Sequence, residues 1–181
     1  MLSLVIPERE VFVEATDSFV TVKSTVLRLE HSLVSISKWE SVWKKPFLVK
    51  DPPKTREESI DYIRCMTISQ NVDPMVYYSL GPSEVKQVNE YIDSNLSATV
   101  VKRPPQTRAS TQIVTSELIY AWMVGYRIPF ECQKWHLSRL LALIDICDIH
   151  NNPGKKMSKR EILAQNHALN AARRAKLHTK G

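Results

Sequence analysis

The sequence predicts an α+β fold that is predominantly helical: a small N-terminal β-sheet, then a helical bundle, then a basic C-terminal helical tail. Three observations predict this fold. The first 30 residues contain segments rich in β-branched residues, which favour strands. Apolar residues then recur every three or four positions to about residue 148, which is the period of a helix. Lys and Arg are concentrated in the last 27 residues.

Three short segments near the N-terminus are expected to be strands. They are Leu2–Ile6, which ends at Pro7, Phe19–Val22 and Thr25–Leu29, and they have the residue types that fit a half-buried pleated surface. The two residues between the second and third segments, at 23–24, are few enough to connect these strands as a hairpin. They lack the Asn-Gly or Asp-Gly sequence of a tight turn.

Capping residues and apolar spacing predict three helices between residues 32 and 92. Their starts are marked by Ser32, by the T-x-x-E capping box of Thr55 and Glu58, and by Pro82, because these residue types favour the first positions of helices. The first helix is expected to end before Pro46. Each helix carries an apolar stripe for the core, formed by Leu33, Ile36, Trp39 and Trp43, by Ile60 and Ile63, and by Val85, Val88, Tyr91 and Ile92.

Two more helices are expected in the second half of the chain. Thr115 or Ser116 caps a helix over residues 117–126, and Pro129 breaks the chain after it. A long helix follows from about Glu131 to Asp148. Apolar residues nearly encircle this helix, as expected if it lies in the middle of a bundle or against a partner.

The sequence Asn-Asn-Pro-Gly at 151–154 marks the clearest boundary in the chain. We therefore expect residues 1–30 and 31–152 to form one folded body and residues 153–181 to form a separate tail. From Lys155 to Gly181 the chain has eight Lys or Arg and one acidic residue, a net charge of +7, whereas the rest has a net charge of −1. The S-x-x-E box of Ser158 and Glu161 predicts a tail helix, whose few large apolar residues favour ordering on a partner.

Signatures of catalysis and of cofactor binding are scarce. The four glycines are isolated, whereas phosphate-binding loops need clustered glycines. Cys132 with His136 and Cys147 with His150 have metal-ligand spacing, but a continuous helix would hold the two cysteines about 22 Å apart. We therefore expect buried thiols and no metal site, no cofactor and no enzymatic activity.

The chain is expected to work in a reducing compartment and away from membranes. Its cysteines are three in number, which does not suit a disulfide framework. No apolar run approaches the roughly 18 residues that a membrane span requires, and the first residues lack the features of a signal peptide.

Aromatic and basic side chains are the expected binding residues. Trp43 is followed by Lys-Lys-Pro and Phe47, and an exposed Trp–Phe pair would anchor a partner; the alternative is that the tryptophans pack in the core. The basic loop at 102–112 is either a binding element or a solvated insertion. The tail is expected to contact an acidic protein surface, to bind nucleic acid, or to stay solvated through its basic residues Lys155, Lys156, Lys159, Arg160, Arg173, Arg174 and Lys176.

Three stretches of the chain resemble a group of tailed-bacteriophage proteins encoded among tail genes, similar to the tail assembly chaperones of long-tailed phages. They are His31–Ser41, Thr115–Tyr120 with Ile128–Cys132, and Leu169–Arg174. The resemblance covers most of the chain, including the tail. No chemical motif defines the chaperone role.

The resemblance implies a helical protein that binds the long tape measure protein in the host cytoplasm before the tail tube polymerises around it, and is then absent from the mature virion. A groove beside Trp122 and Trp135 would hold the client helices, and the tail would contact tube subunits or acidic parts of the client. A chaperone of this kind could also self-associate. Two alternatives remain open: a phage nucleic-acid-binding protein that acts through the tail, and a structural virion connector or tail-completion protein.

Overall fold

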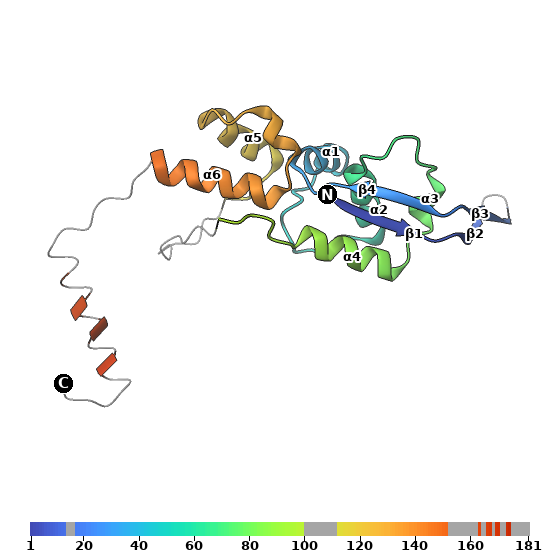
Figure 1. Cartoon of the computed structure of the whole chain (residues 1–181), viewed down its shortest axis with the longest axis horizontal. Coiled ribbons are helices and arrows are strands. Elements are labelled where there is room, and N and C mark those ends of the chain that lie inside the picture. Colours follow the sequence, from blue (N-terminus) through green and yellow to red (C-terminus); the bar gives the residue numbers. More distant parts are fainter. Residues whose placement is uncertain are drawn as a thin grey trace. The chain divides into compact units, whose positions relative to one another are not determined.

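The computed structural model of the chain describes residues 1–13, 17–99 and 112–151, together with seven residues of the tail. The chain divides into two units, Met1–Cys147 and Asp148–Gly181. The first unit is α+β and mainly helical, as the sequence predicts (Figure 1). No helix in the described part of the chain combines the length and the apolar character that crossing a bilayer requires.

The N-terminal residues form one long antiparallel hairpin with a break in the middle. β1 (Leu2–Ile6) pairs with β4 (Thr25–Leu29), and β2 (Arg9–Val13) pairs with β3 (Ser18–Val22). In both ladders the numbers of paired residues add up to 31. One register therefore continues across the break, and β2 with β3 forms the far end of the hairpin, which we call the arm (Figure 1).

The predicted hairpin between residues 19–22 and 25–29 is wrong. Both segments are strands, but each pairs with a strand that precedes them in the chain. The link at 23–24 lacks the residues with positive φ that a two-residue turn requires, so the chain passes through it without reversing. Opposite this link, Pro7 has no N–H to donate, which accounts for the interruption of the ladder there.

One face of the β1–β4 ladder forms the base of the hydrophobic core. Leu4, Ile6, Leu27 and Leu29 are completely buried, while Val26 on the other face is 54% exposed. This alternation is the period of two that a half-buried strand has. The core continues from this face between the helices and includes Leu33, Ile36, Trp39, Tyr62, Ile63, Met66, Val88, Ile119, Met123, Leu137, Leu140 and Ile144.

The helices that the capping residues predict are present. α1 (Leu33–Trp43), α2 (Arg56–Met66) and α4 (Pro82–Ile92) begin where Ser32, Thr55–Glu58 and Pro82 indicate. α5 (Ser116–Gly125) is capped by the Thr115 side chain. A short helix, α3 (Met75–Tyr78), lies between α2 and α4.

The long helix expected from residue 131 to residue 148 is interrupted. The 3₁₀ helix η2 (Phe130–Lys134) comes first, and α6 (Leu137–Asn151) follows after two non-helical residues. The interruption occurs because His136 pairs with Ser32 as in a sheet and the Leu137 N–H donates to the His31 carbonyl at 2.8 Å. α6 buries a single stripe of residues instead of its whole circumference.

A buried carboxylate ties three parts of the first unit together. Glu40 on α1 is 6% exposed, and its two oxygens accept the backbone N–H groups of Phe47 at 2.7 Å and Ser116 at 2.8 Å. Hydrogen bonds to an ionised group are stronger than neutral ones. Glu40 therefore fixes the loop after α1 and the start of α5 against α1.

Candidate protein-binding groove

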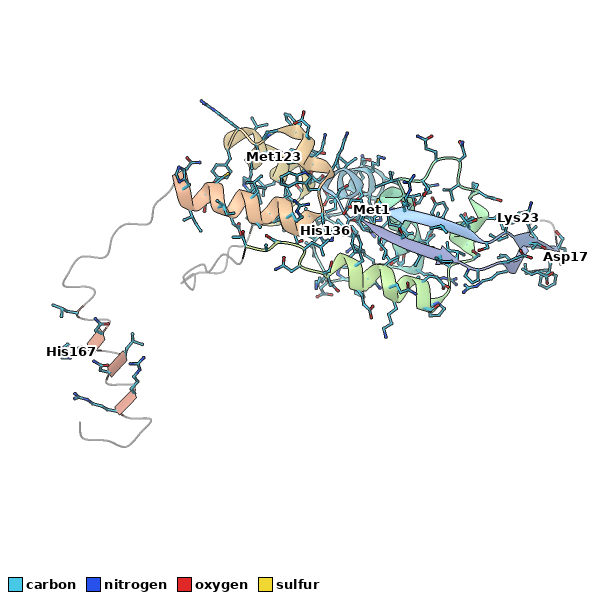
Figure 2. All side chains as sticks on the ribbon, viewed as in Figure 1. Met1, Asp17, Lys23, Met123, His136 and His167 are labelled. Carbon is cyan, nitrogen blue, oxygen red and sulfur yellow. The ribbon has the colours of Figure 1, made fainter. Side chains whose placement is uncertain are left out.

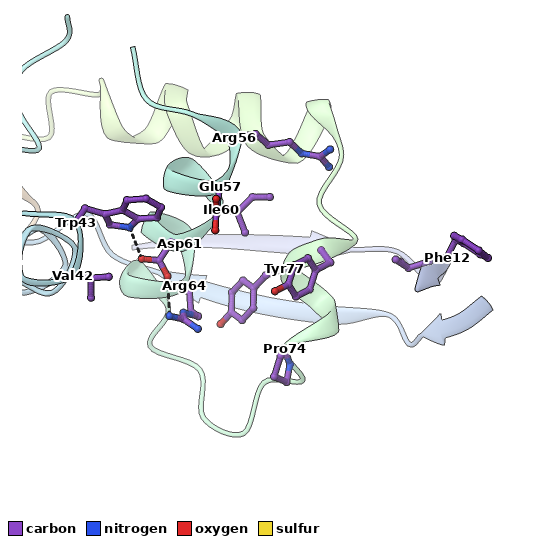
Figure 3. Close-up of a pocket in the computed structure, with 12 residues that line it drawn as sticks. Phe12, Val42, Trp43, Arg56, Glu57, Ile60, Asp61, Arg64, Pro74 and Tyr77 are labelled. Atoms are coloured by element: carbon purple, nitrogen blue, oxygen red, sulfur yellow. Dashed lines mark hydrogen bonds and ion pairs between the residues drawn. The ribbon is translucent and has the colours of Figure 1, made fainter. Parts of the chain in front are cut away.

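An open groove of about 1040 Å³ lies between the arm and the first three helices (Figure 3). Its lining mixes aliphatic and aromatic side chains with two arginines and two carboxylates. The lining residues are Val11, Phe12, Val42, Trp43, Arg56, Glu57, Ile60, Asp61, Arg64, Pro74, Tyr77 and Tyr78.

α1 and α2 form one end of the groove through a fixed set of polar contacts. The Trp43 indole N–H donates to Asp61 Oδ2 at 2.9 Å, and Arg64 Nη2 lies 2.8 Å from Asp61 Oδ1. The Trp43 ring also stacks on Trp39, with ring centroids 6.1 Å apart. These contacts hold the indole in one orientation, so this end of the groove is formed before any partner binds.

Exposed apolar side chains lie along the groove. Val42 on α1 is 63% exposed and Tyr78 on α3 is 65% exposed, while Ile60 on α2 is half-buried. Apolar surface that is grouped in this way marks interaction sites more often than scattered apolar residues do. The groove can therefore bury a partner's apolar side chains.

The arm continues the apolar surface beyond the groove. Phe12 and Phe19 face each other across the β2–β3 ladder, with ring centroids 5.2 Å apart. They are 47% and 70% exposed. A pair of solvent-exposed phenylalanines on a two-stranded arm contributes little to folding, because such a hairpin is marginally stable by itself.

The base of the arm is fastened to the body by Arg9. Arg9 Nη2 lies 2.6 Å from Glu84 Oε1 on α4, and Nη1 donates to the Ser79 carbonyl at 2.8 Å. Burial by itself would raise the pKa of Glu84, but the hydrogen bond from Arg9 and contacts within the first turn of α4 hold it below its ordinary value. Glu84 is therefore ionised and paired.

The comparisons with known proteins give no relative for this arrangement. No family model, curated protein or solved structure matches the chain. The groove, the arm and the residues themselves are therefore the basis for assigning a function.

Of the expected anchor pair, the structure places Trp43 in the groove and Phe47 in the core. Phe47 is 7% exposed and its ring stacks on Tyr62 with centroids 3.9 Å apart. The reason is that the chain turns back after α1, where the Phe47 N–H donates to Glu40. Phe47 thus supports the wall behind Trp43 and offers no surface to a partner.

Trp122 and Trp135 do not line this groove. Trp122 on α5 is half-buried and packs against the core. Trp135 follows η2, is 37% exposed, and has the Arg139 guanidinium 4.8 Å from its ring centroid. Phe130 in η2 is 52% exposed, and its ring centroid lies 6.4 Å from that of Tyr120.

The expected basic binding residues are only partly described. Arg173 and Arg174 are helical and exposed, as are the other described tail residues Leu163, Asn166, His167, Leu169 and Asn170. Lys155, Lys156, Lys159, Arg160 and Lys176 lie outside the described residues, as does the basic loop except for Gln112.

Two buried histidines lie where α1, α2 and the start of α6 meet. His31 Nδ1 and the Tyr62 hydroxyl are 2.5 Å apart, and the rings of His31 and His136 have centroids 5.2 Å apart. His136 lies directly before α6 (Figure 2). Burial, with the neighbouring His136 as a second cause, lowers the pKa of His31 to about 3. Because the two rings are 3% and 4% exposed, they support packing and are not accessible to a substrate.

The cysteine–histidine pairs with metal-ligand spacing do not converge. Cys132 lies in η2 and His136 lies beyond its end, so the two are not neighbours on one helix face. Within the residues that the structure describes, no three His, Cys, Asp or Glu side chains are close enough together to hold a metal ion.

Sequence reasoning missed most of the groove residues. Val11 and Phe12 were missed because residues 9–13 were not predicted as a strand. Val42 and Tyr78 gave no signal, since an exposed apolar residue cannot be told from a core residue by periodicity alone.

Proposed function

We propose that the protein is a tail assembly chaperone of a tailed bacteriophage, and that its groove binds apolar helices of the tape measure protein. The observation that supports this proposal is the exposed apolar lining at Val42 and Tyr78 beside Trp43. An amphipathic helix docks in such a groove through side chains at positions i, i+3, i+4 and i+7. Covering those side chains removes apolar surface from water, which keeps the client soluble.

Co-expression with fragments of the tape measure protein tests the proposal. The native chain should give a soluble complex, and the double variant Val42→Asp with Tyr78→Ser should lose it. Val26→Asp is the matched control, because Val26 is 54% exposed but does not line the groove. A client that stays insoluble with the native chain would contradict the proposal.

A second candidate function is nucleic-acid binding through the tail. The exposed Arg173 and Arg174 favour it, since clustered cations release counterions from phosphate backbones. DNA or RNA affinity should then fall steeply with salt and be lost when residues 153–181 are deleted. No binding at low salt would eliminate this candidate.

A further inference from the structure

The outer face of the arm has a defined charge pattern. Glu10 is exposed and lies two residues before Phe12, so the two share one face of β2. Asp17, also exposed, precedes β3 at the far end of the arm (Figure 2). Glu10 and Asp17 thus place one carboxylate on each side of the Phe12–Phe19 pair along the arm.

The groove has the complementary pattern along α2. Arg56 and Arg64 are exposed and lie at opposite ends of the helix, with Ile60 between them (Figure 3). Eight residues of helix place them about 12 Å apart. Glu57 and Asp61 are also present. Asp61 accepts the Trp43 indole N–H and is ion-paired with Arg64, whose side chain is 65% exposed and keeps further N–H donors for a second carboxylate. Arg56 has no ion-pair partner among the described residues.

We propose that the groove also accepts the arm of a second copy of this chain. Phe12 and Phe19 of one copy would cover Ile60 and Tyr78 of the other, and Glu10 and Asp17 would meet Arg56 and Arg64. Each copy contributes one arm and one groove, so reciprocal exchange closes a two-fold dimer.

The arm supplies only part of this contact to its own groove, through Val11 and Phe12. Its base is fixed by the Arg9–Glu84 pair and by Val22, which is 2% exposed. Phe12 borders the groove, but Phe19 does not line it. Phe19, which is 70% exposed, and the exposed half of Phe12 therefore remain available to another molecule.

The apolar surface fits a weak, reversible dimer. Phe12, Phe19 and Tyr78 are 47%, 70% and 65% exposed, so in both copies together they can still bury about 550–900 Å², if a whole ring buries about 150–250 Å². Interfaces below about 1,200 Å² are typical of weak complexes. We therefore expect a dimer that dissociates on dilution.

Sedimentation equilibrium of the full chain, in reducing buffer and over a range of concentrations, tests the proposal. The native chain should associate to a dimer, and the variant Phe12→Ser with Phe19→Ser should be monomeric. Circular dichroism establishes that each variant is folded. The control variant Lys86→Ala changes an exposed cation outside the groove and should still form dimers.

A charge exchange makes the test specific to this pairing. The variant Arg56→Glu with Arg64→Glu reverses the charge of these two groove residues and should abolish the dimer. Adding Glu10→Arg and Asp17→Arg to the same variant should restore it. A native chain that is monomeric at every concentration, or a dimer that survives the phenylalanine substitutions, would overturn the proposal. The experiment needs no client, so its outcome is separate from that of the chaperone proposal.

Discussion

Arg9 is the side chain that joins the arm to the body, and its removal should be costly. Glu84, its partner, has a side chain that is 5% exposed. In Arg9→Ala this carboxylate stays buried without a counter-charge, so the free energy of unfolding should fall by about 2–3 kcal/mol. Urea denaturation measures the change.

The control for this prediction is Lys86→Ala. Lys86 and Glu90 lie 3.9 Å apart and are 78% and 66% exposed, and such surface pairs contribute about 0.5 kcal/mol or less. Equal losses in Arg9→Ala and Lys86→Ala would show that Arg9 does not act through its buried partner.

His31 should make stability depend on pH above the range in which carboxylates titrate. Its pKa in the folded chain is about 3, below the value of about 6.5 in an unfolded chain. The folded chain therefore binds this proton more weakly, so the stabilisation is complete above pH 6.5 and is lost as the pH falls toward 3. The slope is at most about 1.4 kcal/mol per pH unit for each such histidine, and burial lowers the pKa of His136 in the same direction.

Urea denaturation between pH 7 and pH 5 isolates this effect. Glu58, Glu84 and Glu117 have lowered pKa values, and they add their own loss of stability only near and below about pH 4.3. In His31→Gln the slope between pH 7 and pH 5 should be smaller than in the native chain. An unchanged slope would assign the pH dependence to other groups.

At the scale of elements, helix starts could be predicted from the sequence, whereas strand pairing could not. Ser32 and the Thr55–Glu58 box act within one turn of their helices, so local sequence determines them. The pairing of β1 with β4 joins residues more than 18 positions apart and depends on which faces reach the core. His136 interrupts the expected helix for the same reason, since its partner Ser32 is distant in sequence.

The arm should be dispensable for folding. We expect that replacing residues 11–20 with Asn-Gly, which closes a two-residue hairpin, changes the free energy of unfolding by no more than about 1 kcal/mol, because a two-stranded hairpin adds little stability. Arg9 and Val22 at the base are retained. Leu27→Ala, which removes a completely buried side chain, should cost about 2–5 kcal/mol by the same urea assay. A comparable loss on shortening the arm would mean that the arm is part of the folding unit.

At the scale of the whole molecule, the groove could not be predicted, because it is formed by residues from β2, α1, α2 and α3. Taken alone, each of these elements has the apolar spacing of an ordinary strand or helix. Trp43 was identified because a tryptophan next to two lysines and a proline is unusual, but the same reasoning placed Phe47 at the surface. Only the packing of the loop against Glu40 and Tyr62 distinguishes the two residues.

The uneven charge of the chain leads to a prediction about salt. The segment from Lys155 to Gly181 has a net charge of +7 and the remainder −1, so the tail should account for the electrostatic steering of an acidic client. A chain that ends at Asn151 keeps all of α6 and should have an unchanged melting temperature, because the described tail residues are exposed. Its association rate with the client should be lower at low salt and should vary little with salt, since screening weakens only the tail's contribution.

Stopped-flow measurement at two salt concentrations, with thermal melts of both chains, checks this prediction. A full-length variant with the tail Lys and Arg residues changed to Gln is the matched control, because it keeps the length and removes the charge. It should behave as the truncated chain does. If the truncated chain melts at a lower temperature while the Gln variant does not, the tail stabilises the first unit through its backbone or apolar residues, and its role is not steering alone.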